Sequence, residues 1–426
     1  MKKGQWSSLG FFGLFVAMLG GNAAALEPDQ LPKNALQNAH IKSIRVQPRA
    51  HLNGQAHARF GIPLIDSLVN WNDQFFADGF DSAGNPNRHW YTNTVGNPPQ
   101  RHGTTFINAP IVPVVVDMRN ADGSPRFVGG TRLISDPAPF VQLVVDSPVF
   151  SNASWSSSPV PTQLTDAVQR AEYYATAKDD WHTTLVPGVK ATRTMVLIEG
   201  TYRFVLNDDG SCCFFVLVDI DAFDNAFFDV IVAVVNAGDI TTKDLSTFLF
   251  PNVYLYGNGD PTDCCILGYH TYLYEPADPA SGNIEKRWVL NYSSWTTDGI
   301  FFENVIRDIQ TLGHEVAETY NDPFVASDGV HNITPWYLWG SDDAGFLCDH
   351  IREVGDVIDV VEDLNKVAFP ILMPNGFTYH PQNYALLQWF AREFPSSALH
   401  GAYSYPDETA LPNLGPPNLK PGCGLP

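Results

Sequence analysis

The sequence predicts an α+β fold in which a mixed, twisted sheet packs against one active-site helix. Short β-branched and aromatic runs bounded by turn residues are typical of buried strands. The stretch 301–320 instead carries apolar residues at the spacing of a helix. The 426 residues are 44% apolar and 17% charged, which suits a folded chain of one large or two ordinary domains.

The charge balance argues against two classes of partner. Lysine and arginine number 25 against 46 aspartates and glutamates, which gives a formal net charge of −21. Like charge repels nucleic-acid backbones and anionic membranes, and no basic patch offsets it. We therefore expect no nucleic-acid partner, whereas divalent metal ions fit this composition better.

The first 25 residues have the features of a bacterial secretory signal peptide. Lys2 and Lys3 precede an apolar run at 9–20, which is short for a bilayer span, and the small-residue site 23–25 follows. We expect cleavage near Ala25, secretion to the periplasm or the exterior, and no membrane partner afterwards. An uncleaved membrane anchor is the alternative.

Two further parts are expected along the chain. Residues 26–87 contain two weakly apolar stretches separated by polar segments, which indicates an N-terminal extension or a propeptide-like segment. Residues 88–426 carry the stronger strand and helix patterns and form the main domain, with a Pro-rich C-terminal tail at 406–426.

Within the main domain, each element is predicted from its residue pattern. Two aromatic-rich runs, 265–274 and 287–295, flank a polar loop and predict a strand pair. The apolar residues at helical spacing predict a helix at 303–320, and Pro323 ends it. The other predicted strands are 111–116, 141–145, 195–206, 213–220 and 228–235, and the other predicted helices are 165–177, 241–250 and 382–392.

Six cysteines lie in the second half of the chain. An even number in an exported protein predicts a disulfide framework without free thiols, with at least one bridge between segments more than about 40 residues apart. A thiolate zinc site is the minor alternative, because no C-x-x-C spacing is present. The six are Cys212, Cys213, Cys264, Cys265, Cys348 and Cys423.

The predicted helix carries the segment His314-Glu315-Val316-Ala317-Glu318. His314 and Glu318 are four residues apart, so they project from one face and can share an ion, and we expect them within about 5 Å. The spacing is that of the zinc-protease H-E-x-x-H motif with a carboxylate in place of the second histidine, which puts Glu315 in the general-base position. A solvated helix face is the alternative.

A third ligand must come from another segment. Glu353 is the first choice, because the glycine in Glu-Val-Gly-Asp at 353–356 permits a turn that aims a carboxylate inward. Asp356, Asp322 and the cluster at 348–350 (Cys-Asp-His) stay open as ligands. Zinc is the expected metal from the motif. Because carboxylates are hard donors, calcium and manganese stay open as alternatives.

Tyr379 and His380 stand at the end of a predicted strand, just before a predicted helix. There they can supply an oxyanion donor over the cleft. The alternative is a tyrosine and a histidine at a strand end, with their hydrogen bonds satisfied by backbone partners.

Several linked segments occur in a fixed order along the chain. They are DCCILGYH (263–270), HEVAE followed by Asp-Pro (314–318, 322–323), EVGD (353–356), and NGFTYH with a later Trp-Phe (375–380, 389–390). Together they resemble a family of secreted bacterial proteins, many from soil bacteria, that have a zincin-like domain. The resemblance runs from about Thr92 to the C-terminus, and a more distant likeness is to the plant exordium, or phosphate-induced, proteins.

The resemblance implies a zincin-like metalloprotease fold with His314 and Glu318 as ligands and Glu315 as base. We therefore expect a secreted metallopeptidase for peptide or protein substrates, in which Glu353 completes the metal site and Glu315 takes a proton from a metal-activated water. The alternative is a secreted binding or cell-surface structural protein that keeps the fold and a structural cation without turnover.

Overall fold

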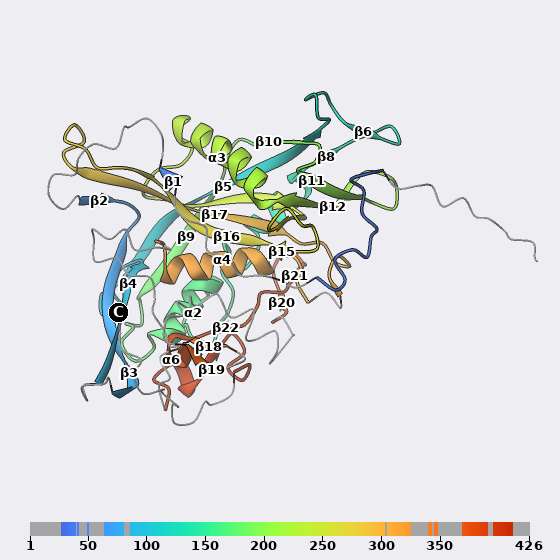
Figure 1. Cartoon of the computed structure of the whole chain (residues 1–426). Helices are drawn as coiled ribbons and strands as arrows, with labels where there is room; N and C mark the ends of the chain where they lie inside the picture. The colour runs from blue at the N-terminus through green and yellow to red at the C-terminus, as the bar shows by residue number, and fades with distance from the viewer. Residues whose placement is uncertain are drawn as a thin grey trace, which may run out of the picture.

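The computed structural model describes residues 27–39, 41, 49–50, 64–80, 86–302, 305–324, 340–342, 345–347, 369–390 and 395–411. Its architecture is mixed α/β, with a central, largely parallel sheet and few helices in these residues (Figure 1). This arrangement is compatible with the predicted α+β class.

The central sheet has nine strands among the described residues. Most of its pairs are parallel, but β16 and β17 are antiparallel, which confirms the predicted pairing of the two aromatic-rich runs. Its path is β1 (Arg49–Ala50), β16 (Gly268–Glu275), β17 (Ile284–Trp295), β13 (Leu245–Pro251), β5 (Thr104–Arg119) and β10 (Arg193–Ile198). Off this path, β2 (Leu64–Asp66) pairs with β17, while β8 (Ile134–Ser135) and β9 (His182–Val189) pair with β5.

Strand alternation divides the sheet's side chains between two cores. On β5, Val112 and Val114 pack in the core of α3 (Ile220–Asn236), whereas Ala109 and Ile111 pack in the core of the helices on the other side. Figure 1 shows α3 on one side of the sheet and the other helices below it. That second core contains α1 (Ala138–Val145), α2 (Leu164–Glu172) and α4 (Gln310–Asn321).

A second sheet of four strands adjoins the α3 core. Val216 of the second sheet packs with α3, while its neighbour Leu217 belongs to a separate core on the opposite face. The strands are, in order, β11 (Tyr202–Leu206), β12 (Cys212–Asp219), β14 (Val253–Tyr256) and β15 (Cys264–Ile266). The described residues also form five two-stranded antiparallel sheets. They pair β3 (Asn70–Phe80) with β4 (Pro86–Val95), β6 (Phe127–Val128) with β7 (Thr131–Arg132), β18 (Gly340–Asp342) with β19 (Gly345–Leu347), β20 (Ile371–Leu372) with β21 (Thr378–Tyr379), and β22 (Tyr384–Ala385) with β23 (Ser404–Tyr405). Two short helices, α6 (Leu387–Phe390) and the 3-10 helix η2 (Leu399–Gly401), complete the described elements.

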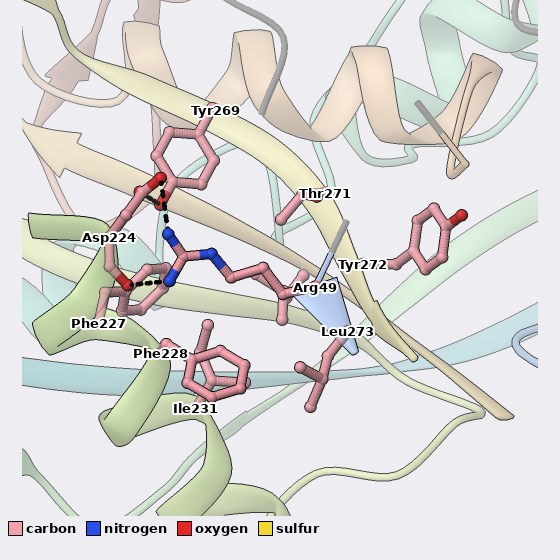
Figure 2. Close-up of a pocket in the computed structure, with 10 residues that line it drawn as sticks. Arg49, Asp224, Phe227, Phe228, Ile231, Tyr269, Thr271, Tyr272 and Leu273 are labelled. Atoms are coloured by element: carbon pink, nitrogen blue, oxygen red, sulfur yellow. Dashed lines mark hydrogen bonds and ion pairs between the residues drawn. The ribbon is translucent and has the colours of Figure 1, made fainter. Parts of the chain in front are cut away.

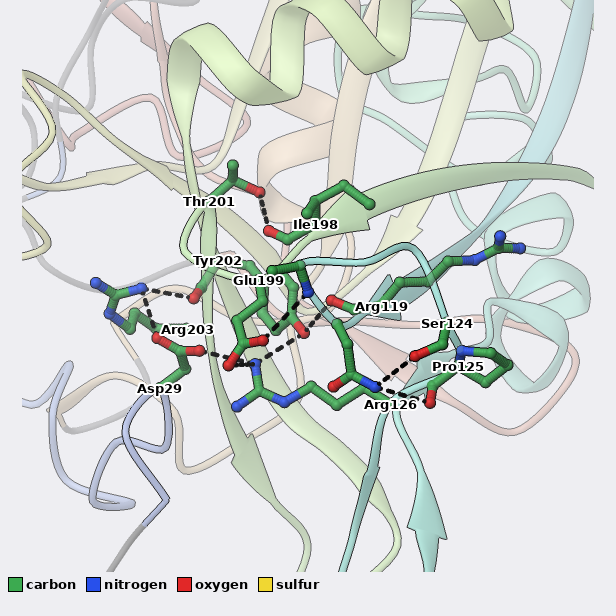
Figure 3. Close-up of polar contacts among 12 residues, drawn as sticks. Asp29, Arg119, Ser124, Pro125, Arg126, Ile198, Glu199, Thr201, Tyr202 and Arg203 are labelled. Atoms are coloured by element: carbon green, nitrogen blue, oxygen red, sulfur yellow. Dashed lines mark hydrogen bonds and ion pairs between the residues drawn. The ribbon is translucent and has the colours of Figure 1, made fainter.

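The segment 27–39 packs on the second sheet. The carboxylate of Asp29 accepts hydrogen bonds from Arg126 at 2.7 Å and from Arg203 at 3.0 Å (Figure 3). Leu36 is buried in the core beneath this sheet. An ionic contact and an apolar anchor therefore both hold the segment to the body.

Strand β1 is anchored to α3 by Arg49. Its Nη1 donates to the backbone oxygen of Asp224 at 3.0 Å, its Nη2 lies 3.6 Å from the Asp224 carboxylate, and the Tyr269 hydroxyl donates to the same carboxylate at 2.7 Å (Figure 2). Strands β1 and β2, which lie within 26–87, both pair with the central sheet. The domain boundary expected at residue 87 lies inside β4.

Three predicted elements have the wrong type. Residues 141–145 lie in α1 and 228–235 in α3, although both were predicted as strands, whereas 241–250 was predicted as a helix and overlaps β13. A short apolar run suits either a buried strand or a buried helix, so its periodicity does not separate the two.

Other predicted elements have different bounds. Helix α4 begins at Gln310 and not at 303, because Asp308 has a φ of 42°, which interrupts a right-handed helix. Helix α2 ends at Glu172, before the predicted end at 177. Residues 195–206 divide into β10 and β11, and 382–392 contains β22 and α6 where one helix was predicted.

Four cysteines form two vicinal pairs. The sulfur atoms of Cys212 and Cys213 lie against each other, and those of Cys264 and Cys265 do the same. These four therefore do not cross-link separate segments of the chain. Cys348 and Cys423 lie outside the described residues, so a long-range bridge stays a prediction.

The predicted signal peptide, 1–25, lies outside the described residues. Among the helices that are described, none combines the length and the apolar character that a bilayer span requires.

Candidate metal centre

The centre lies where α4 packs against β16 and β17 (Figure 1). Every residue of α4 is buried, so the solvated-face alternative for this helix is wrong. Val316 and Ile309 pack in the core of α1, α2 and α4, whereas Ile306 is buried in the core beneath the second sheet. The predicted burial of these three residues is confirmed, but the two isoleucines precede the helix. The polar residues of α4 are thus held inside the protein.

Two of the predicted ligands meet on α4. His314 Nε2 lies 2.9 Å from Glu318 Oε1, which confirms the expected proximity of the pair. His314 Nδ1 lies 3.3 Å from the side-chain oxygen of Gln382, so a residue distant in sequence also contacts this imidazole. His314 and Glu318 are only 8% and 6% exposed.

The central sheet adds a histidine that the sequence analysis missed. His270 Nδ1 lies 3.0 Å from Glu318 Oε2 and 3.8 Å from Glu315 Oε2. Ligand atoms of His270, Glu315 and Glu318 all lie within 4.8 Å of one another, and no other group of this kind occurs in the described part of the chain. The resemblance segment 263–270 ends on His270, which was the signal available in the sequence.

The hydrogen bonds of His270 constrain its protonation. Nε2 lies 2.9 Å from the backbone oxygen of Asp322, and because a carbonyl only accepts, Nε2 donates the proton. A neutral imidazole then points the lone pair of Nδ1 at the Glu318 carboxylate, 3.0 Å away. Two acceptors approach this closely only with a second proton or a cation between them. Histidine ligands in metal sites have this same second contact to a carbonyl.

Glu315 supplies a second feature suited to a cation. Its Oε2 is buried and accepts no hydrogen bond within 3.5 Å from the described residues. Leaving a buried carboxylate oxygen without a donor costs about 1–3 kcal/mol or more. The donor set of one imidazole and two carboxylates therefore fits a divalent ion, by its chemistry and by this unpaired oxygen.

The two carboxyl groups have opposite pKa shifts. Burial raises the pKa of Glu315, and the charge of Glu318 raises it further against the attraction of His270 and His314. Burial also raises the pKa of Glu318, but the charge of His314 and the hydrogen bond with His270 outweigh burial and lower it. Glu318 is thus the more firmly ionised carboxylate of the pair.

Two glycines permit the close packing around these groups. A Cβ at Gly268 would lie 2.5 Å from Glu315 Oε1, so only glycine lets β16 approach the helix here. A Cβ at Gly313 would lie 2.6 Å from the hydroxyl of Tyr384. The lack of a side chain at Gly313, beside His314, therefore leaves room for a tyrosine side chain.

Of the other candidate ligands, the structure describes only Asp322. Asp322 meets the centre through its backbone oxygen, which accepts from His270. Glu353, Asp356 and the cluster at 348–350 lie outside the described residues, so their roles stay predictions.

Tyr379 and His380 have partners elsewhere. The Tyr379 hydroxyl donates to the backbone oxygen of Leu143 at 2.7 Å, and His380 Nδ1 lies 2.7 Å from Asp308. This matches the alternative to an oxyanion role, in which both side chains have their hydrogen bonds satisfied at a strand end. The difference is that His380 pairs with a carboxylate and not with the backbone. In the same segment it is Gln382 and Tyr384 that approach His314 and Gly313.

Comparisons with known proteins identify no relative: no protein-family model, no curated protein and no solved structure matches this chain.

Proposed function

We propose that this protein is a secreted, metal-dependent hydrolase, most simply a zinc metallopeptidase with a zincin-like fold. The observation that carries the proposal is the buried convergence of His270, Glu315 and Glu318, whose ligand atoms lie within 4.8 Å of one another. The order of motifs along the sequence supports peptide substrates and export.

The residues of the centre divide into two tasks. His270, Glu315 and Glu318 would hold a divalent ion, and that ion supplies Lewis-acid polarisation of a substrate carbonyl and a more acidic water. His314 Nε2 lies 2.9 Å from Glu318 Oε1, so it orients this carboxylate and can hold a proton beside it. In the rival assignment from the motif alone, His314 is a ligand and Glu315 is the base.

A structural cation without turnover is the second candidate. It is favoured by burial, since these side chains are 3–8% exposed, whereas a catalytic ion needs an open coordination position. Zinc, manganese and calcium all remain candidates, because two carboxylates make the donor set hard.

Metal analysis of the purified protein tests the proposal. We expect about one divalent ion per chain, together with cleavage of an unfolded protein substrate that chelation abolishes and the metal restores. His270→Ala should lose both metal and cleavage. His182→Ala is the matched control, because it removes another buried histidine that pairs with a carboxylate, Asp166, at 2.7 Å. If the protein binds a metal ion but cleaves no substrate with zinc, manganese or calcium, the structural cation would be favoured.

A further inference from the structure

A second polar cavity lies between the loops on either side of α2. Its volume is about 560 Å³, and it is lined by residues 156–159 before the helix and by Arg170, Tyr174 and Asp179 from its last turn onward. Cavities of this size hold small molecules or a few residues of a peptide. None of its lining residues belongs to the candidate metal centre.

Arg170 is buried at this cavity without a bonded counter-ion. It is 5% exposed, and its guanidinium donates only to backbone carbonyls: Nε to Ser157 at 3.3 Å, and Nη1 to Lys178 at 3.2 Å and to Trp181. No carboxylate of the described residues lies within ion-pair distance of it. Nη2 meets no acceptor in the same part of the chain, so two N–H groups of a buried cation stay unused.

Two of the three carboxylates nearest Arg170 are engaged with other partners. Asp166 accepts from Thr162, His182 and the backbone of Thr183 at 2.5–2.7 Å. Asp180 pairs with His102 at 2.8 Å. Asp179 is exposed and lines the cavity itself.

Two serine hydroxyls add further unused hydrogen-bonding capacity. Ser157 Oγ and Ser158 Oγ are buried and have no hydrogen-bond partner among the described residues, whereas Ser156 Oγ already donates to Glu408 at 2.9 Å. A hydroxyl without a partner costs about 1–3 kcal/mol, and a rotation about χ1 lets each serine donate to a bound ligand.

We propose that this cavity binds a monoanionic carboxylate, with Arg170 as its charge partner. The surrounding carboxylates Asp166, Asp179 and Asp180 disfavour a dianionic phosphate, because Arg170 is the only cation among the described residues that line the cavity. A carboxylate matches the two N–H groups of Nη2 together with one or two serine hydroxyls. The carboxylate is either the C-terminus of a peptide or a free organic acid.

Calorimetric titration of the full-length protein with four probes tests the proposal. The probes are N-acetyl-trialanine, its C-terminal amide, propionate and inorganic phosphate. We expect the peptide acid to bind at least about 10-fold more tightly than the amide, because a charge-assisted bond to a buried cation is lost. Propionate as tight as the peptide acid would assign the site to free organic acids. Equal binding of acid and amide, no binding of either acid, or tighter binding of phosphate would overturn the proposal.

Variants of the lining residues test whether the probe binds in this cavity. Asp179→Asn removes an exposed lining carboxylate and should tighten carboxylate binding by about 2- to 5-fold, whereas Asp229→Asn, an exposed aspartate on α3, should leave binding unchanged. Arg170→Lys and Ser158→Ala should both weaken binding, and the serine change leaves the buried cation in place if the lysine variant folds poorly. Affinity unchanged in both Asp179→Asn and Ser158→Ala would place the bound probe elsewhere and overturn the assignment.

Discussion

A single interatomic contact, between His270 Nδ1 and Glu318 Oε2, sets the chemistry of the candidate metal centre. The distance is 3.0 Å, and the other ring nitrogen already donates to the Asp322 carbonyl. Either a proton, as in a buried ion pair, or a metal ion must therefore bridge these two atoms. Beside it, the buried Oε2 of Glu315 accepts no hydrogen bond from the residues that the structure describes, and this is the reason to propose the metal.

Glu315→Gln tests the role of this residue. We expect it to lower metal affinity by about 10-fold or more, since an amide oxygen is a neutral and weaker ligand. Metal content after dialysis against limiting zinc measures the loss. Glu172→Gln is the control, because it changes a buried carboxyl group outside the ligand group. Full metal content with turnover reduced by about 100-fold would instead assign Glu315 as the base.

Glu172 should make stability depend on pH. Burial raises its pKa to about 8, and the nearby Leu387 backbone and Asn321 side chain offset this only in part. The folded state then holds a proton that the unfolded chain releases near its ordinary pKa of 4.5. Its stabilising contribution is full below about pH 4.5 and is lost as pH rises through about 8, by about 1.4 kcal/mol per pH unit at most. Urea unfolding from pH 5 to 8 should show a shallower decline for Glu172→Gln, and equal slopes would contradict the shift.

At the scale of elements, the close approach of β16 to α4 builds the centre. A helix with His314, Glu315 and Glu318 on its surface provides carboxylates, but His270 joins them only because the strand passes directly beside the helix. Gly268 permits this approach, since a Cβ there would also lie 2.8 Å from the backbone oxygen of Tyr292.

Gly268→Ala should therefore damage the centre before it damages the fold as a whole. The added methyl group meets Glu315 Oε1 and should displace that carboxylate, with a loss of stability of about 1–3 kcal/mol and weaker metal binding. Metal titration and thermal unfolding measure the two effects. Gly188→Ala on β9 is the control, because no atom lies within 4 Å of a Cβ at that position. Unchanged metal affinity in Gly268→Ala would show that metal binding does not depend on the close approach of β16 to α4.

At the scale of the whole molecule, the segment 27–39 closes one face of the second sheet. Asp29 is 7% exposed and Arg126 is 5% exposed, and they form a 2.7 Å ion pair across 97 residues of sequence. Removal of one partner from a buried pair leaves an uncompensated charge.

Asp29→Ala should lower the free energy of unfolding by about 3 kcal/mol and make the segment susceptible to proteases. Lys33→Gln is the control in the same segment, because the Lys33–Asp208 pair is exposed and should contribute less than about 1 kcal/mol. Chemical unfolding and limited proteolysis with N-terminal sequencing provide the measurements. Equal stability of the two variants would mean that Leu36, and not the ion pair, holds the segment.

Local patterns were sufficient for part of this protein. The β-branched run of β5, the aromatic pair β16 and β17, and the i, i+4 spacing of His314 and Glu318 all follow from residue type and period, because each depends on neighbours in sequence. The same patterns failed for 228–235 and 241–250, where an apolar run fits a buried helix as well as a buried strand.

Long-range packing decided the rest. His270 stands 48 residues before Glu318, and no periodicity links a strand residue to a helix residue at that separation. Gln382 reaches His314 across 68 residues, while Tyr379 and His380, three and two residues before it, turn to Leu143 and Asp308. A side chain's partner depends on which elements the core brings together, so the ligand group and the buried Arg170 emerge only from the tertiary structure.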